Sequence, residues 1–377
     1  MLKCFVKSLP LKNNIVQILL CFFLQLHIIY PSNEWGEFMK ILFIGGTGLI
    51  STASSKLVVE KGHELYLLNR GNRSDFSPAG ANIIKADIND VSEVENATKG
   101  MNFDAVVNWI AFTPKEIERD IKLFAGKTRQ YIFISSASAY QKPVLNYLID
   151  ESTPLANPHW EYSRNKAACE DRLMEEYRKN GFPFTTVRPS LTYGDVLIPA
   201  AVTSWNNPWS LVDRMRKGKK IIVHGDGTAL WSMTHNTDFA KGLVGLLGNS
   251  QAIAHSFHIT TDEVLSWDQI YKTIGAAAGV TPDIIHIPTD FLMLFDPSEE
   301  GNLLGDKAPS AVFDNSKIKK FVPGFVATMS FAEGVKRTID WFEAKPERCV
   351  VDEAWNAQCD RIIAAYELGV AVAKGAK

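Results

Sequence analysis

The chain has 377 residues, of which 46% are hydrophobic, so it can bury one large core or two unequal ones. Its formal net charge of −2 argues against a surface whose main role is to bind a polyanion. The five cysteines show no paired short spacing and the eight histidines are scattered. We therefore expect a reducing compartment, without a disulfide framework or a metal site.

Residues 1–38 pose a separate question. The stretch 15–30 is almost wholly apolar and follows three lysines, as in an uncleaved signal or a membrane anchor. It is short for a full span and lacks an A-x-A-like cleavage site. The alternative is that Met39 starts the native protein, because the first strand begins one residue later. We favour that start and a cytoplasmic protein; a membrane-anchored or exported protein is expected only if residues 1–38 are genuine.

The first folded unit is predicted from residue 40 onward. Residues 41–44 form a short apolar run that is stopped by glycine, which indicates a strand buried on both faces. Apolar side chains then recur every three to four positions over 49–58, and Gly62 can end that helix. Residues 64–68 resume as a second strand. The order strand, helix, strand predicts a βαβ unit.

A glycine-rich turn joins the first strand to the helix. Gly45, Gly46 and Gly48 permit a tight turn and close approach of a ligand, while the helix start offers unpaired N–H groups, as a diphosphate requires. Gly45, Gly48 and Ser51 follow the spacing G-x-x-G-x-x-G with serine in third place. An ordinary strand-to-helix turn is the alternative. The flanking strand and helix favour a dinucleotide site, although the Cβ atom of Ser51 must fit where helix and strand pack.

The alternation continues along the chain. Strands are predicted within 81–87, ending at Asp87, within 103–112 and within 130–140, with helices at 91–100 and 114–125 between them. This order implies right-handed crossovers and a doubly wound parallel sheet of the Rossmann type, an α/β fold. A ligand then lies at the carboxyl ends of the strands.

The candidate chemistry follows the fifth strand. Tyr162 and Lys166 are four residues apart in a segment of helical composition, which places them on one face. A nearby ammonium favours the phenolate, so we expect Lys166 to lower the pKa of Tyr162 toward a useful range. Ser136, at the end of the fifth strand, can hydrogen-bond a substrate oxygen. A Tyr-x-x-x-Lys pair alone is common on helix surfaces; its place behind the glycine turn favours catalysis.

Beyond residue 188 the pattern is less regular. We predict a dinucleotide-binding domain over 39–188 and a smaller α/β substrate lobe within 189–344, built from 189–235, 255–295 and 300–315 and interleaved with returns to the sheet. For residues 345–377 we predict a helical tail that packs on the domain or on a neighbouring subunit. A homodimer is therefore one possible oligomeric state.

A collinear series of motifs resembles the extended short-chain dehydrogenase/reductases of the NAD-dependent epimerase/dehydratase family. It includes GGTGLIS at 45–51, SSASAY at 135–140, YSRNK at 162–166 and VRPSLTYG at 187–194. The resemblance implies Tyr162 as acid/base, Lys166 on the nicotinamide ribose and Ser136 orienting the substrate. The cofactor-binding residues that it and the first unit indicate are Gly45, Thr47, Gly48, Leu49, Ile50, Asn69, Arg70, Arg73, Asp87, Ile88, Asn108, Trp109, Tyr162, Lys166 and Pro189.

Departures from the family pattern narrow the expected substrate. Ala137 and Ser138 stand where dehydratases of the family carry acidic residues, which argues against elimination of water. Leu191 and Trp231 replace an asparagine and an arginine expected near a nucleotide diphosphate, which argues against a UDP-sugar. We expect a small sugar or sugar derivative; the residues leave epimerase and reductase open.

The end of the second strand favours NADP, with NAD as the alternative. An acidic residue that accepts hydrogen bonds from both ribose hydroxyls is typical of NAD-using relatives, but Asn69 stands here. Arg70 and Arg73 follow and can pair with a 2′-phosphate.

A second hypothesis is an RNA-binding or scaffolding protein on the same fold, because FIGGT and LLNRG resemble chloroplast stem-loop-binding relatives. Its candidate surface is RMRKGKK, with Arg214, Arg216, Lys217, Lys219 and Lys220. The alternative for these residues is a helix end whose cations complement the macrodipole. The set Ser136, Tyr162 and Lys166 favours an enzyme, so we expect no nucleic-acid partner.

Overall fold

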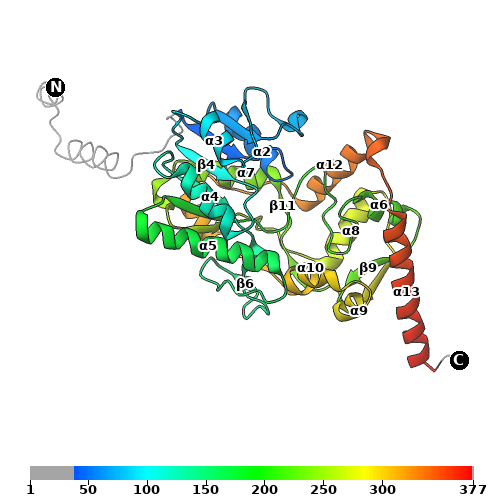
Figure 1. The fold of residues 1–377 in the computed structure, drawn as a ribbon. Coiled ribbons are helices and arrows are strands. Elements are labelled where there is room, and N and C mark those ends of the chain that lie inside the picture. The colour runs from blue at the N-terminus through cyan, green and yellow to red at the C-terminus, as the bar shows by residue number, and fades with distance from the viewer. Residues whose placement is uncertain (1–37, 376–377) are drawn as a thin grey trace, which may run out of the picture. The chain divides into compact units, whose positions relative to one another are not determined.

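The central element is a seven-stranded parallel sheet, seen in a computed structural model that describes residues 38–375 (Figure 1). The strands lie in the order β12-β7-β5-β4-β1-β2-β3, and every neighbouring pair is parallel. Their bounds are β1 Lys40–Ile44, β2 Glu64–Asn69, β3 Asn82–Lys85, β4 Ala105–Asn108, β5 Tyr131–Ile134, β7 Phe184–Arg188 and β12 Ser256–His258. The predicted doubly wound α/β fold is confirmed.

Helices cover both faces of the sheet because alternate strand side chains point to opposite sides. Ile41 and Phe43 pack in a cluster with Leu243, whereas Leu42 and Ile44 pack in another. The first cluster lies under α2 Ser51–Glu60, α7 Asn236–Leu246 and α11 Ser316–Phe321; the second lies under α3 Val91–Ala97, α4 Pro114–Phe124 and α5 Glu161–Asn180. β1 is thus buried on both faces, as its continuous apolar run predicts.

Three elements differ in position from the prediction. The first helix begins at Ser51, so Leu49 lies in the turn before it. The third strand ends at Lys85, because the Asp87 side chain instead accepts a hydrogen bond from the Asn89 N–H at 3.0 Å and forms a turn. Residues 256–258, placed in the substrate lobe from sequence, join the central sheet as β12 beside β7.

A second lobe is built from the chain after β7. It contains α6 Trp209–Arg216, β9 Ile221–His224, β10 Leu230–Trp231, β13 Leu265–Ser266, α8 Trp267–Ala277, β14 Ile284–Ile287, α9 Thr289–Met293, α10 Glu300–Asn302, a π-helical turn Leu303–Lys307 and α12 Phe331–Glu343. β9 pairs in parallel with β14, and β10 pairs antiparallel with β13. Two further short strand pairs are parallel: β6 Leu148–Ile149 pairs with β15 Val312–Phe313, and β8 Thr192–Tyr193 pairs with β11 Thr234–His235.

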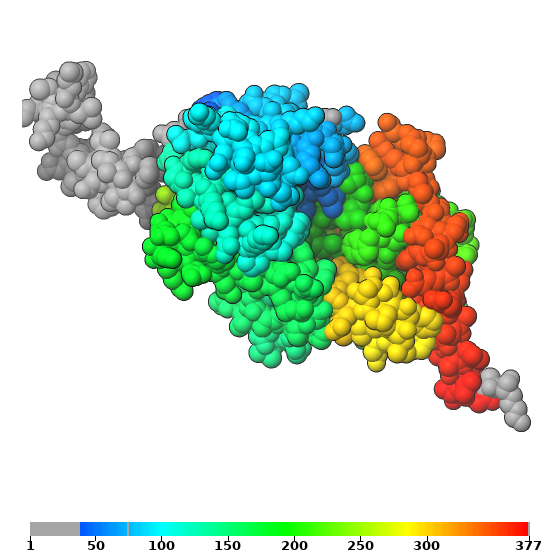
Figure 2. Space-filling view, viewed as in Figure 1, coloured from blue at the N-terminus to red at the C-terminus, as the bar shows by residue number. Residues whose placement is uncertain are grey.

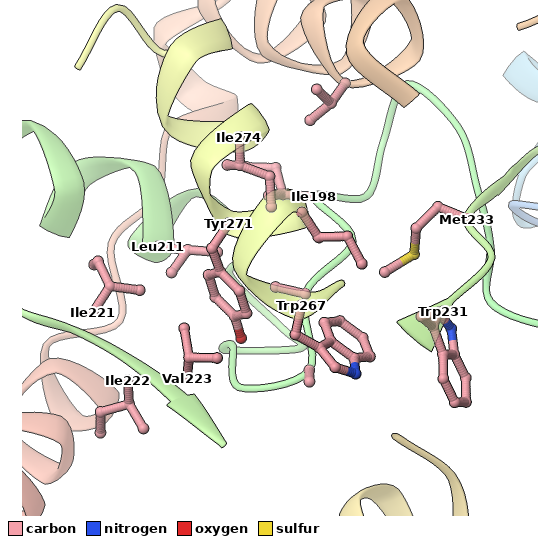
Figure 3. Close-up of a cluster of buried hydrophobic side chains, with 14 of the residues drawn as sticks. Ile198, Leu211, Ile221, Ile222, Val223, Trp231, Met233, Trp267, Tyr271 and Ile274 are labelled. Carbon is pink, nitrogen blue, oxygen red and sulfur yellow. The ribbon is translucent and has the colours of Figure 1, made fainter. Parts of the chain in front are cut away.

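The second lobe has its own hydrophobic core (Figure 3). Trp231 and Trp267 are fully buried, with their ring centroids 5.6 Å apart. Tyr271, on the same helix as Trp267, donates a hydrogen bond from its hydroxyl to the Val202 carbonyl at 3.3 Å. The lobe is therefore held by its own aromatic packing, as the large apolar content allows. The domain boundary at residue 188 stays a prediction.

The C-terminal tail is helical, as predicted. α13 Glu353–Ala373 buries Cys359, Ile362 and Ile363 in the core of the second lobe (Figure 1). In the described part of the chain, no helix combines the length and the apolar character that crossing a membrane requires. The apolar stretch 15–30 lies outside the described residues.

Candidate active site

A cavity of about 600 Å³ lies at the carboxyl ends of the first strands. Fourteen of the fifteen predicted cofactor-binding residues line it: Gly45, Thr47, Gly48, Leu49, Ile50, Asn69, Arg70, Arg73, Asp87, Ile88, Trp109, Tyr162, Lys166 and Pro189. Figure 2 shows a hollow between the N-terminal layer, in blue, and helix α12, in orange. These residues lie close together because the carboxyl ends of parallel strands meet at one edge of the sheet.

The glycine turn forms one wall of this cavity. Gly45 and Gly46 adopt φ angles of +99° and +90°, which side chains rarely tolerate. A Cβ atom added to Gly46 would lie 2.6 Å from Leu67 Cδ2, and the Ser55 hydroxyl donates to the Gly46 carbonyl at 2.7 Å. The close contact between α2 and the strands is therefore made at Gly46 and Ser55. The spacing of the motif did not identify these two residues.

The start of α2 is open to an anion. The N-cap residue Ile50 makes no side-chain hydrogen bond to this helix, and Thr47, Gly48 and Leu49 at its start line the cavity. Ser51 fits without displacing the helix, because its hydroxyl accepts a hydrogen bond from the Gly48 N–H at 2.8 Å. The serine in third place is therefore compatible with the turn.

The loop after β2 supplies two exposed cations to the cavity. Asn69 accepts a hydrogen bond from the Gly71 N–H at 2.8 Å, which fixes the loop that follows. Arg70 and Arg73 are exposed and line the cavity, and neither forms an ion pair with another residue of the range 38–375. The Arg73 guanidinium lies 4.6 Å from the centroid of the Phe76 ring.

Asn108 does not line the cavity, contrary to the sequence-based assignment. It is fully buried, its amide N–H₂ donates to Asp120, and its oxygen accepts from the Ile110 N–H at 2.7 Å. Asn108 therefore shapes the loop after β4 from inside. Sequence reasoning missed Asn72 and Asn89, which line the cavity beside Arg70 and Asp87; the only signal for them was their position after strands.

Tyr162 and Lys166 come together on the first turns of α5, as predicted. Lys166 is 1% exposed, and its ammonium donates to the carbonyls of Ala111 at 2.6 Å and Ile134 at 2.8 Å. The ammonium also lies 5.7 Å from the centroid of the Tyr162 ring. Trp160 packs on the other side, with its ring centroid 4.9 Å from that of Tyr162. The phenol is thus fixed in place at the cavity wall.

The expected lowering of the Tyr162 pKa is wrong for this state of the protein. Burial raises the pKa of Tyr162, the Ser136 hydroxyl opposes that rise by hydrogen bonding, and the Asp306 carboxylate adds to it. Burial also lowers the pKa of Lys166 to about 8. The ammonium is directed at two carbonyl oxygens, which explains why it does not offset the desolvation of the phenol.

Ser136 is half-buried beside Tyr162 but is not a wall residue of the cavity. Its hydroxyl oxygen lies 2.8 Å from that of Ser138, which also accepts a hydrogen bond from Ser163 at 2.7 Å. This chain of hydroxyls holds Ser136 at the end of β5. Within residues 38–375, no group of three or more His, Cys, Asp or Glu side chains is arranged to hold a metal ion.

The basic segment proposed for RNA is not a free surface. Arg214 is 2% exposed and contacts Asp360 at 2.6 Å. The four other cations also meet carboxylates: Arg216 meets Glu343, Lys217 meets Asp213, Lys219 meets Asp360 and Lys220 meets Glu367. Most of these carboxylates belong to α12 and α13, which the segment anchors to the second lobe.

The sequence matches the model of the NAD dependent epimerase/dehydratase family over residues 41–260. The chloroplast stem-loop binding protein of 41 kDa b from Arabidopsis thaliana is 27% identical over 268 residues, which cover 67% of each chain. The 2′-dehydrokanamycin reductase of Streptomyces kanamyceticus is 20% identical over 288 residues, covering 76% of this chain and 80% of the relative.

Among solved structures, an epimerase from Methanothermobacter thermautotrophicus superposes with a TM-score of 0.68 at 15% sequence identity, covering 83% of this chain and 94% of that structure. At this identity the likeness shows the fold.

Proposed function

Because the chain belongs to the NAD-dependent epimerase/dehydratase family, we propose that it is an NAD(P)-dependent oxidoreductase or epimerase acting at a hydroxyl-bearing carbon of a sugar-like substrate. The observation that carries the proposal is that Tyr162 and Lys166 line the same cavity as the glycine turn. A dinucleotide site and a proton-transfer group on one wall are what hydride transfer at a carbinol carbon requires.

The residues present fit a nicotinamide dinucleotide. The turn at Gly45 and Gly46 has no side chains to block a diphosphate, and the uncapped start of α2 supplies N–H groups. Asp87 and Ile88 would border the adenine, and Lys166 would hold the nicotinamide ribose. When bound, the cofactor supplies or accepts the hydride.

Tyr162 would move the proton. Its raised pKa keeps the phenol protonated at neutral pH, so it can donate to the oxygen of a carbonyl that is being reduced. Ser136, at the end of β5, would hold the same oxygen. Phe112 and Trp160 flank the Tyr162 ring and limit the access of water to it.

The cofactor proposed is NADP. Asn69 presents no carboxylate to repel a 2′-phosphate, and two arginines without acidic partners among the described residues stand at the cavity edge. The other reading is that both arginines are solvated loop residues and that Asn69 bonds an unphosphorylated ribose.

The decisive experiment is Tyr162→Phe. We expect NADP to bind nearly as in the wild type and turnover with a carbonyl substrate to fall by about 100-fold or more, because the change removes a proton-transfer group and leaves the cavity intact. Tyr177→Phe, on the same helix but at its far end, is the matched control and should keep full activity. A Tyr162→Phe enzyme with more than about a tenth of the wild-type rate contradicts the assignment.

RNA binding is the second candidate, favoured by the name of the stem-loop-binding relative. The ion pairs of the segment 214–220 weaken it, since each of its five cations already contacts a carboxylate. A gel-shift titration with structured RNA at low and high salt tests it: salt-dependent binding in a protein that turns over no carbonyl compound would favour RNA over catalysis.

A further inference from the structure

A third cation lies beside the loop that brings Arg70 and Arg73 to the cavity. Lys85 is the last residue of β3 and pairs in register with Asn69, the last residue of β2. A Cβ atom added to Gly71 would lie 3.6 Å from Lys85 Cε and 3.9 Å from its Cδ. The Lys85 side chain therefore lies over the main chain of Gly71, and its ammonium, one bond beyond Cε, is next to the loop that carries both arginines.

The three cations have no acidic partner of their own. Lys85 is exposed, and like the two arginines it forms no ion pair with any residue of the range 38–375. Asp75 is close to Arg73 in the chain but pairs with none of the three. Positive charge is thus concentrated around one short loop, although the chain as a whole carries a net charge of −2. Such a surface attracts an anion.

The loop holds Arg73 in a defined position. Asn69 accepts a hydrogen bond from the Gly71 N–H at 2.8 Å, and Gly71 adopts a φ of +81°, which suits glycine. The Phe76 N–H donates to the Arg73 carbonyl at 3.1 Å, which closes the 3₁₀ turn Ser74–Phe76. The guanidinium carbon of Arg73 then lies 4.6 Å from the centroid of the Phe76 ring. This contact limits the directions in which Arg73 can point, so less side-chain freedom is lost when it meets a ligand.

We propose that Lys85 and Phe76 complete the site for the 2′-phosphate of NADP. Lys85 is a third cation that contacts the phosphate, and Phe76 is a positioning residue that directs Arg73 toward it. The inference rests on the proposed cofactor, because the cavity that Arg70 and Arg73 line is the one formed by the glycine turn.

The charge of the ligand fits this number of cations. A phosphate monoester carries about 1.5 to 2 negative charges near neutral pH, so a single guanidinium leaves part of that charge uncompensated. Arg70, Arg73 and Lys85 reach the phosphate from β2 and β3, whose carboxyl ends meet at one edge of the sheet. An unphosphorylated ribose would give Lys85 nothing to bind.

The test measures the phosphate site without turnover. The full-length protein is titrated by calorimetry with adenosine 2′,5′-bisphosphate, with 5′-AMP and with inorganic phosphate. We expect the bisphosphate to bind about tenfold or more tightly than 5′-AMP, and inorganic phosphate at equal concentration not to displace it. Displacement by inorganic phosphate at equal concentration would identify a general anion site and overturn the proposal.

Four variants assign the roles of the two residues. Lys85→Met removes the charge and should weaken the bisphosphate about threefold or more, whereas Lys85→Arg keeps a cation and should bind it as the wild type does. Phe76→Leu removes the ring and should weaken the bisphosphate about two- to fivefold, whereas Phe76→Tyr keeps the ring and should not. Lys319→Met, which removes an exposed lysine paired with Asp262 at 2.7 Å, is the control and should change nothing.

Two readouts separate these roles from damage to the loop. None of the four variants should alter the affinity for 5′-AMP, because that ligand lacks the 2′-phosphate. The preference for the bisphosphate should decrease when NaCl is raised to about 0.5 M, and it should decrease less steeply in Lys85→Met, which has one cation fewer. Equal weakening of 5′-AMP and bisphosphate in Lys85→Met or Phe76→Leu would overturn the role of that residue.

The proposals fail differently. A wild-type preference for the bisphosphate that stays unchanged in Lys85→Met and Phe76→Leu would keep NADP as the cofactor and refute this inference. Equal affinities for bisphosphate and 5′-AMP in the wild type would remove both. The expected pattern in a protein that oxidises NADPH with no carbonyl compound would keep the phosphate site and remove the proposed catalytic function.

Discussion

Arg70 and Arg73 carry the cofactor preference at the scale of single residues. Each guanidinium can form a charge-assisted pair with the 2′-phosphate of NADP, worth roughly 1.5–3 kcal/mol, so we expect a ten- to hundredfold preference over NAD. Arg70→Ala or Arg73→Ala should reduce that preference. Arg178→Ala, an exposed arginine on α5, should not change it. The measurement is titration of both cofactors into each protein; equal affinities in the wild type would show that neither arginine reads the phosphate.

The β1–α2 turn is the element whose geometry the site most depends on. Gly46→Ala places a methyl group against Leu67 at a φ of +90°, and should lower the free energy of unfolding by about 2 kcal/mol or more. Gly48→Ala is the matched control: its added Cβ meets only Ser51 Oγ, at 3.4 Å, so stability should stay within about 0.5 kcal/mol. Urea denaturation without cofactor compares them; equal losses would show that the crowding at Gly46 is not decisive.

At the scale of the whole molecule, residues 39–377 form one compact unit. The Met39 carbonyl accepts from the Glu64 N–H at 2.9 Å, and β1 pairs with both β2 and β4. A protein starting at Met39 should therefore fold and bind NADP as tightly as the full chain. Starting at Phe43 should abolish folding, because it removes the paired residues Lys40–Leu42. Circular dichroism and cofactor titration check both; loss of folding at the Met39 start would assign a structural role to residues 1–38.

Local patterns in the sequence were sufficient to predict the parallel sheet and most of the residues that line the cavity. Continuous apolar runs, helical spacing and glycines between them depend on neighbours a few residues away, so they can be read without knowing the fold. Because parallel strands end at one edge, the residues that follow each strand gather there. That rule alone brought Gly45, Arg70 and Asp87 to one cavity.

Side-chain direction and long-range charge pairing were decided only by the tertiary structure. Asn108 also lies at the end of a strand, but its side chain points into the core. There its amide N–H₂ donates a hydrogen bond to Asp120 of the next helix. The cations of 214–220 look free in sequence, yet their partners Glu343, Asp360 and Glu367 lie more than a hundred residues away. Such pairs depend on how the whole chain packs, and local pattern holds no information about them.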